Sequence, residues 1–119
     1  MHEFPVIVHR DIRWPNLVQS RENPSHWILV DWESSSKLPT TAHSDFSHHS
    51  HPDRVFQDNH GPEVDIWAIG HLLTDAANLI SSYPQEIINF GADIKSNYMT
   101  MTLREVEEKL TIVSSRYLA

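Results

Sequence analysis

The sequence contains no cysteine, which excludes disulfide bonds and thiolate metal sites. Lysine and arginine together number 9 against 16 acidic residues, so the formal net charge is -7. Because nucleic-acid backbones and anionic membranes attract clustered basic side chains, this balance argues against both as partners. No stretch approaches the ~20 consecutive apolar residues that span a bilayer, and none has the character of a secretory signal peptide. We therefore expect an intracellular chain, in cytoplasm or nucleus.

Glycine is also scarce, with 3 residues at positions 61, 70 and 91. They are too widely spaced to form a Gly-rich loop over phosphate groups. The chain of 119 residues has the length of one domain, and its 39% hydrophobic and 21% charged content is ordinary for a folded protein. Composition thus predicts a single folded unit.

Short strands are expected in the first third of the chain. Residues 4–8, 17–19 and 27–30 are rich in β-branched, aromatic and other apolar side chains. Turn-forming residues separate the second and third segments, at positions 20–25. These two segments should therefore form a small hairpin.

Helices are expected at 62–81, 84–90 and 102–114, which gives an α+β fold that is mainly helical. Pro62 suits a helix start, and the apolar residues that follow surround the helix almost completely, which predicts a buried element. Gly91 is expected to stop the second helix. Thr102 and Glu105 form a capping box at the start of the third.

The segment from His9 to Asn16 places a carboxylate and a carboxamide five residues apart in a turn-prone stretch, after the apolar run Val6-Ile7-Val8. Asp11 and Asn16 can face one small volume from two sides of a loop. A carboxylate there can accept a proton, while an amide oxygen helps to hold a metal ion. Asp31, which follows the third predicted strand, is expected to join them.

These residues resemble protein-kinase motifs. His9-Arg10-Asp11, with Asn16 five residues after the aspartate, matches the pattern H-R-D-x-x-x-x-N of the kinase catalytic loop. Asp31 resembles the aspartate of Asp-Phe-Gly, although Trp32 and Glu33 replace its last two residues. The segment 65–70 resembles the Asp-x-Trp-x-x-Gly signature of the central helix of the large lobe. The chain resembles the large lobe of a protein-kinase-like domain, particularly that of divergent fungal kinase-like proteins.

The resemblance implies a role for each motif residue in ATP-dependent phosphorylation of protein Ser/Thr. Asp11 would be the base, Arg13 would contact the transferred phosphate, and Asn16 and Asp31 would hold Mg²⁺. Asp65 and His9 would support the loop, and Arg10 would pair with a phosphorylated residue in the activation-like segment 34–60. The hydroxyl candidates for that modification are Ser34, Ser35, Ser36, Thr40, Thr41 and Ser44.

Several parts of a kinase have no counterpart in these 119 residues. The Gly-rich loop, the strand lysine, the helix glutamate and the small lobe that carries them are absent, as are the first helices of the large lobe. The segment His51-Pro52-Asp53 is a weak version of the closing Ala-Pro-Glu, and Thr100 stands where its arginine partner is expected. We therefore expect a partial domain, residues 1–119, with little or no activity by itself.

Other interpretations compete with the kinase-like one. The chain could be a non-catalytic, pseudokinase-type fragment that binds a protein through an exposed surface of the lobe, or a truncated chain without an autonomous role. The candidate site residues could also be loop side chains that satisfy local backbone donors. A solvated polar loop is the favoured view of the histidine-rich stretch, but zinc or copper binding is an alternative. Its candidate ligands are His43, Asp45, His48, His49 and His51.

Overall fold

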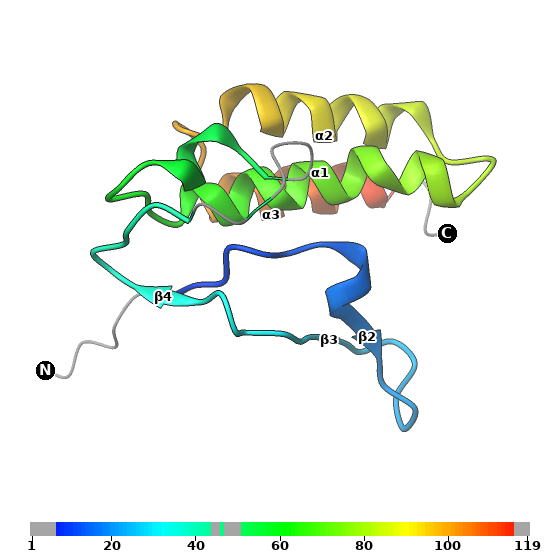
Figure 1. Cartoon of the computed structure of the whole chain (residues 1–119). Coiled ribbons are helices and arrows are strands. Elements are labelled where there is room, and N and C mark those ends of the chain that lie inside the picture. Colours follow the sequence, from blue (N-terminus) through cyan, green and yellow to red (C-terminus); the bar gives the residue numbers. More distant parts are fainter. Residues whose placement is uncertain (1–6, 44–45, 47–50, 116–119) are drawn as a thin grey trace, which may run out of the picture.

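A computed structural model describes residues 7–43, 46 and 51–115 of the chain. The described part has three α-helices and two short, two-stranded antiparallel sheets, which confirms the α+β class. Figure 1 shows the helices together in one layer, with the strands and their loops in a second layer below them. We call residues 7–43 the loop layer and the three helices the helix layer. Within the described residues, no helix is both long enough and apolar enough to cross a bilayer.

The first sheet of the loop layer joins β1 (Ile7–Val8) to β4 (Ser36–Lys37). The strand expected at 4–8 is described only for its last two residues, because residues 1–6 lie outside the described chain. Strand β4 was not predicted, since two polar residues carry no periodic signal. Its partner is almost thirty residues away in the sequence, so only the tertiary fold defines it.

The second sheet is the predicted hairpin of β2 (Leu17–Gln19) and β3 (Trp27–Leu29). Leu17 pairs with Leu29, and Val18 pairs with Ile28. A 3-10 turn at Trp14–Asn16 precedes β2, and the N–H of Val30 donates to the carbonyl of Asn16 at 2.8 Å. This last bond continues the ladder, so the hairpin ends against the loop that carries the candidate site.

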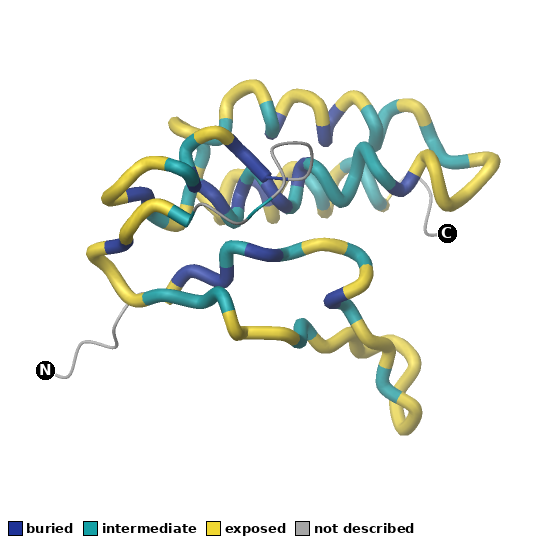
Figure 2. Tube along the Cα trace, in the orientation of Figure 1, coloured by how far each residue is buried: buried dark blue, intermediate teal, exposed yellow. Residues whose placement is uncertain are grey.

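Helix α1 (Glu63–Leu79) lies at the centre of the molecule, where the periodicity predicted it. Its inner residues Val64, Ile66 and Ala76 are buried, but Leu79 and the following Ile80 are 64% and 53% exposed. The prediction that this helix is buried on nearly all sides is therefore wrong for its C-terminal end. Figure 2 shows the C-terminal end of α1 in the colour of exposed residues.

Helix α2 (Gln85–Asn97) continues well past Gly91, so the predicted stop at that glycine is wrong. Gly91 is there for packing. A Cβ at this position would lie 2.7 Å from the carbonyl oxygen of Gly70 and 2.8 Å from the Cβ of Leu73. The two glycines let the backbones of α1 and α2 approach closely, which a side chain at either position would prevent.

Helix α3 (Leu103–Ser114) begins with the predicted capping box, in which the Thr102 side chain accepts from the N–H of Glu105. The helices enclose the main apolar core, whose buried members are Ile66, Phe90, Ile94 and Val106. Leu103, the first residue of α3, is 59% exposed. The core of the helix layer therefore lies mostly between α1 and α2, and α3 closes it with Val106.

Candidate functional site

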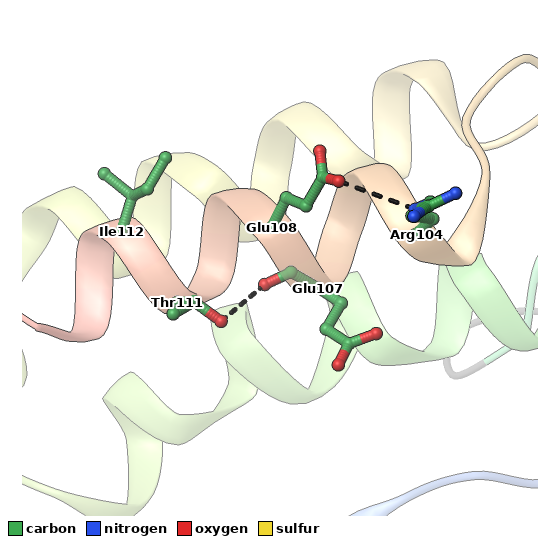
Figure 3. Close-up of a pocket in the computed structure, with 5 residues that line it drawn as sticks. All are labelled: Arg104, Glu107, Glu108, Thr111 and Ile112. Atoms are coloured by element: carbon green, nitrogen blue, oxygen red, sulfur yellow. Dashed lines mark hydrogen bonds and ion pairs between the residues drawn. The ribbon is translucent and has the colours of Figure 1, made fainter.

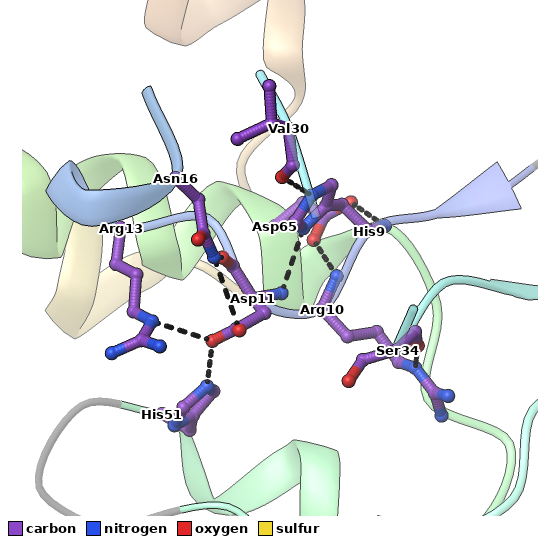
Figure 4. Close-up of polar contacts among 9 residues, drawn as sticks. All are labelled: His9, Arg10, Asp11, Arg13, Asn16, Val30, Ser34, His51 and Asp65. Carbon is purple, nitrogen blue, oxygen red and sulfur yellow. Dashed lines mark hydrogen bonds and ion pairs between the residues drawn. The ribbon is translucent and has the colours of Figure 1, made fainter. Parts of the chain in front are cut away.

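The loop that carries Asp11 is held by a carboxylate from the central helix. Asp65, in the first turn of α1, accepts the N–H of His9 at Oδ2 and the N–H of Arg10 at Oδ1, both at 2.8 Å. Figure 4 shows both bonds beside the loop. Burial raises the pKa of Asp65, and the two amide bonds oppose that shift because they favour the charged form. The loop-supporting contact that the sequence assigned to Asp65 is present.

Arg10 joins this loop to the start of the activation-like segment. Its backbone is left-handed, with φ of 74°, a conformation that costs a non-glycine residue about 1–2 kcal/mol. Its guanidinium donates to the carbonyl of Ser34 and to that of Thr41, and Nη1 lies 3.5 Å from Nε2 of His60. Burial lowers the pKa of Arg10, and the Asp65 carboxylate opposes the shift. Arg10 therefore contacts the ends of a segment whose hydroxyls were candidates for phosphorylation.

The hydroxyl candidates differ in access. Thr40 is 2% exposed and donates its hydroxyl to the carbonyl of His60, so a kinase could not reach it in this conformation. Ser35 donates to the Trp32 carbonyl at 2.6 Å, and Ser36 lies in β4. Thr41 is exposed, and its carbonyl is held by Arg10. Ser44 lies outside the described residues.

His9 connects the loop to the end of the hairpin. It is 2% exposed, its Nδ1 accepts the N–H of Asp11 at 3.1 Å, and its Nε2 lies 3.1 Å from the carbonyl of Val30. Since Nδ1 accepts, Nε2 carries the proton and donates to Val30. The ring of Trp32 contacts His9 edge-on, at 4.6 Å between centroids. Val30 and Trp32, which follow β3, are thereby fixed relative to the candidate base.

The carboxylate of Asp11 has two side-chain hydrogen-bond partners and one ion-pair partner. Oδ1 lies 2.9 Å from His51 Nε2 and 3.3 Å from Arg13 Nε, and Oδ2 lies 3.2 Å from Asn16 Nδ2. The sequence predicted that Arg13 and Asn16 would be near Asp11. It did not predict His51 as a partner of Asp11, because His51 lies forty residues away in a polar stretch without periodicity. Only its position before Pro52, in the segment compared with a kinase closing motif, could have suggested it.

Asn16 and Asp31 are the candidate metal ligands. Asn16 is buried and donates its amide nitrogen to the backbone carbonyl of Asp11 at 2.8 Å, so its carbonyl oxygen is the atom left for a cation. Asp31 is exposed and left-handed, with φ of 60°, and follows Val30, whose N–H bonds to Asn16. An amide oxygen and a carboxylate suit Mg²⁺, which prefers oxygen ligands and keeps several waters.

The histidine-rich stretch provides no metal centre within the described residues, where no group of three or more His, Cys, Asp and Glu side chains converges. Asp45, His48 and His49 lie outside the described residues. His43 and His51 stack on the ring of Phe46, at centroid distances of 3.7 and 3.9 Å. In the part of the chain that the structure describes, these two imidazoles therefore belong to an aromatic stack.

The segment after His51 is fastened to α1 by a pair that sequence reasoning missed. Asp53 begins a 3-10 turn, Asp53–Phe56, and is exposed. The next residue, Arg54, pairs through Nε with Oε1 of Glu63 at 3.4 Å. Thr100, expected in place of an arginine partner for Asp53, is exposed and bonds to Asn97. A Glu–Arg pair therefore closes this segment, with residues in different positions from those expected.

Two hollows lie away from Asp11. A shallow one of about 580 Å³ runs along the outer face of α3, which supplies every side chain that lines it (Figure 3). A smaller, mainly apolar hollow of about 240 Å³ lies between β1, the loop, α1 and α3, with Asp65 in its wall. The second hollow includes Ile12, the residue after Asp11, in its lining.

Comparison with known proteins gives one distant similarity. Over 72 aligned residues the chain is 33% identical to Crinkler effector protein 8 of Phytophthora infestans. The match covers 56% of this chain and 12% of that protein. No protein-family model matches the sequence, and no solved structure matches the chain.

Proposed function

We propose that the Asp11 loop is the base-and-metal half of a phosphoryl-transfer site of the protein-kinase kind, specific for protein Ser/Thr. The observation that supports this most directly is the bonding of Asn16, whose amide nitrogen holds the backbone of Asp11 and leaves its own oxygen for a cation. Arg10, next to Asp11 in the chain, is held in a left-handed backbone conformation. Strained backbone of this kind is common at functional sites.

Each residue then has one task. Asp11 accepts the proton of a substrate hydroxyl while the hydroxyl oxygen bonds to the terminal phosphorus of ATP and the bond to ADP breaks. Mg²⁺ would be held by Asn16 and Asp31 and would neutralise charge on the phosphates. Arg13, whose side chain is about half exposed, pairs with Asp11 through Nε, so its Nη groups would contact the transferred phosphate. Asp65 and His9 keep the loop in place.

These residues lack the groups that clasp the nucleotide. Phosphoryl transfer depends on positioning and charge neutralisation, so the missing Gly-rich loop, lysine and glutamate should cost many orders of magnitude in rate. We infer that the 119 residues alone bind Mg²⁺ and ATP weakly and transfer phosphate very slowly or not at all.

The test measures thermal unfolding of the full chain with and without Mg²⁺ and ATP. We expect millimolar Mg²⁺–ATP to raise the unfolding midpoint of the wild type, because a ligand that binds only the folded state stabilises it. The shift should disappear in Asp31→Asn and persist in Asp53→Asn, whose carboxylate is equally exposed but lies on the 3-10 turn. A midpoint unchanged by Mg²⁺–ATP would remove the main support for the phosphotransferase proposal.

Transfer itself is measured with radiolabelled ATP and a mixture of Ser- and Thr-containing peptides. Any metal-dependent incorporation must vanish in Asp11→Asn, since an amide cannot accept the proton. Robust incorporation by the 119 residues would contradict the inference that they are nearly inactive. Incorporation that survives in Asp11→Asn would place the chemistry elsewhere.

A non-catalytic protein-binding module is the second candidate. The hairpin exposes three large apolar side chains: Val18, Trp27 and Ile28 are 47%, 57% and 53% exposed. Exposed apolar side chains that lie together mark sites of protein–protein interaction. Val18 and Ile28 are cross-strand partners, so they form one patch. This candidate predicts that Val18→Ser with Ile28→Ser abolishes association with a partner, while Mg²⁺–ATP changes nothing.

A further inference from the structure

His51 approaches the candidate base from outside the catalytic loop. It precedes the 3-10 turn Asp53–Phe56, is 8% exposed, and places Nε2 at 2.9 Å from Oδ1 of Asp11. Figure 4 shows it on the opposite side of the Asp11 carboxylate from Asn16. An ionised carboxylate only accepts hydrogen bonds, so Nε2 of His51 carries the proton in this contact.

The His51 ring is fixed by its own neighbours. Phe46 stacks on it at 3.9 Å with the planes 4° apart, and Pro52 next to it is buried. The carbonyl of Val55, which is fully buried, accepts the N–H of His43 at 3.0 Å, and the His43 ring stacks on Phe46. The Phe46 ring holds the imidazole of His51 on one face, and Phe46 is itself held by the stacked ring of His43, so His51 is a rigid donor.

The donors around Asp11 leave its two oxygens unequal. Oδ1 accepts the N–H of His51 at 2.9 Å and forms an ion pair with the Arg13 guanidinium at 3.3 Å, whereas Oδ2 has the Asn16 amide alone. Hydrogen bonds and positive charge stabilise the negative charge on Oδ1. The oxygen that accepts a proton at the smaller cost is therefore Oδ2.

We propose that His51 is a positioning residue for Asp11: together with the Arg13 ion pair it engages Oδ1 and thereby presents Oδ2 to the hydroxyl of the substrate. The proposal rests on the phosphoryl-transfer function above. The hydroxyl O–H bond breaks, its proton goes to Oδ2, and its oxygen bonds to phosphorus as ADP leaves. The alternative is that His51 blocks Asp11 and must move away before the substrate binds. The rigid stack of His51 on Phe46 favours the positioning role.

The test compares two replacements of His51 in the full chain. His51→Phe keeps a flat ring for stacking on Phe46 but has no donor, and His51→Gln keeps an N–H donor in a similar place. His26→Phe is the control, because His26 is exposed in the hairpin turn. If the chain transfers phosphate, we expect His51→Phe to lower kcat roughly 10- to 100-fold with KM for ATP unchanged, since misplaced groups cost about that much. His51→Gln should recover most of the rate.

Nuclear magnetic resonance provides a readout that needs no activity. With ¹⁵N-labelled histidine, Nε2 of His51 should be protonated and hydrogen-bonded, and Asp11→Asn should shift its signal. The side-chain amide of Asn16 should exchange with solvent several-fold faster in His51→Phe and at the wild-type rate in His51→Gln and His26→Phe.

These readouts separate failure of the proposal from failure of the proposed function. An inactive wild type with the expected spectra would refute transfer by this chain and leave the positioning of Asp11 by His51 supported. An unprotonated Nε2, an Asn16 amide indifferent to His51→Phe, or a higher kcat in that variant would each overturn the positioning role. If His51→Phe does not fold, the Nε2 signal of His51 in Asp11→Asn still tests the proposal. A signal unchanged from the wild type would contradict the hydrogen bond between His51 and Asp11.

Discussion

The loop layer and the helix layer are held together by different interactions. Among the described residues of the loop layer, the buried side chains are mostly polar: His9, Asp11, Asn16 and Thr40 beside one apolar residue, Val8. The helix layer buries Ile66, Phe90, Ile94 and Val106 against one another. Hydrogen bonds depend on direction and distance, whereas apolar packing tolerates some rearrangement. The loop layer should therefore be sensitive to the loss of single contacts, and the helix layer to changes of volume.

Few contacts join the two layers, and α1 supplies the best defined of them. Asp65 accepts two loop amides, and the indole N–H of Trp14 donates to the carbonyl of Leu72 at 3.0 Å. The candidate site thus depends on a helix that contributes no side chain to the proposed chemistry. The following predictions test how far each layer depends on its own kind of contact.

The largest effect is expected from Asp65→Ala, which removes both acceptors of the loop amides. Each buried amide left without a partner costs about 1–3 kcal/mol, so we expect a loss of roughly 2–6 kcal/mol in the free energy of unfolding. The variant no longer buries a carboxylate, and the desolvation cost that it avoids offsets a small part of this loss. Urea unfolding followed by circular dichroism measures it. Asp93→Ala on the exposed face of α2 is the control, and equal losses in the two variants would contradict the role of Asp65.

A volume change in the helix layer should have the next largest effect. In Gly91→Ala the new methyl group would meet the Gly70 carbonyl at 2.7 Å, which forces α1 and α2 apart. Overpacking costs about 1–3 kcal/mol, and the higher helix propensity of alanine returns up to ~1 kcal/mol. We expect a net loss of about 1–2 kcal/mol, with the Asn16 side-chain amide signals unchanged. Stabilisation instead would show that the helices do not approach this closely.

The smallest effect is a pH dependence in the helix layer. Lys95 donates to Nδ1 of His71 and to the hydroxyl of Thr74, and its ammonium lies 5.2 Å from the ring centre of Trp67. Burial lowers the pKa of Lys95 below its usual 10.5, and Asp75 opposes the shift. The unfolded chain therefore holds this proton more tightly, so stability rises with pH between the folded-state pKa and 10.5.

We expect the stability of the wild type relative to Lys95→Met to rise by a few tenths of a kcal/mol across that range, because partial exposure weakens the effect. The variant retains Tyr83 and Tyr98, so their ionisation cancels in the difference. Lys109→Met, which is exposed on α3, should show no such slope. A falling difference with increasing pH would reverse the sign assigned to Lys95.

Local patterns predicted much of the fold. The hairpin followed from two β-prone segments on either side of turn formers, and the start of α3 followed from the Thr102 and Glu105 capping box. The length of α2 was predicted wrongly because a glycine, considered without its neighbours in space, indicates a helix end. Gly91 is instead required by the close approach of α2 to Gly70 of α1. Strand β4 was missed because its two polar residues pair with a segment far away in the sequence.

For the candidate site, the sequence by itself determined the residue types and their order: an aspartate and an asparagine five apart, a second aspartate after a strand, and an acid at the start of the central helix. Such spacing is visible because it is local. Only the tertiary structure decided that His51 donates to Asp11 and that Arg54 pairs with Glu63. These contacts join distant segments, and their partners become defined only when packing fixes the loops against α1.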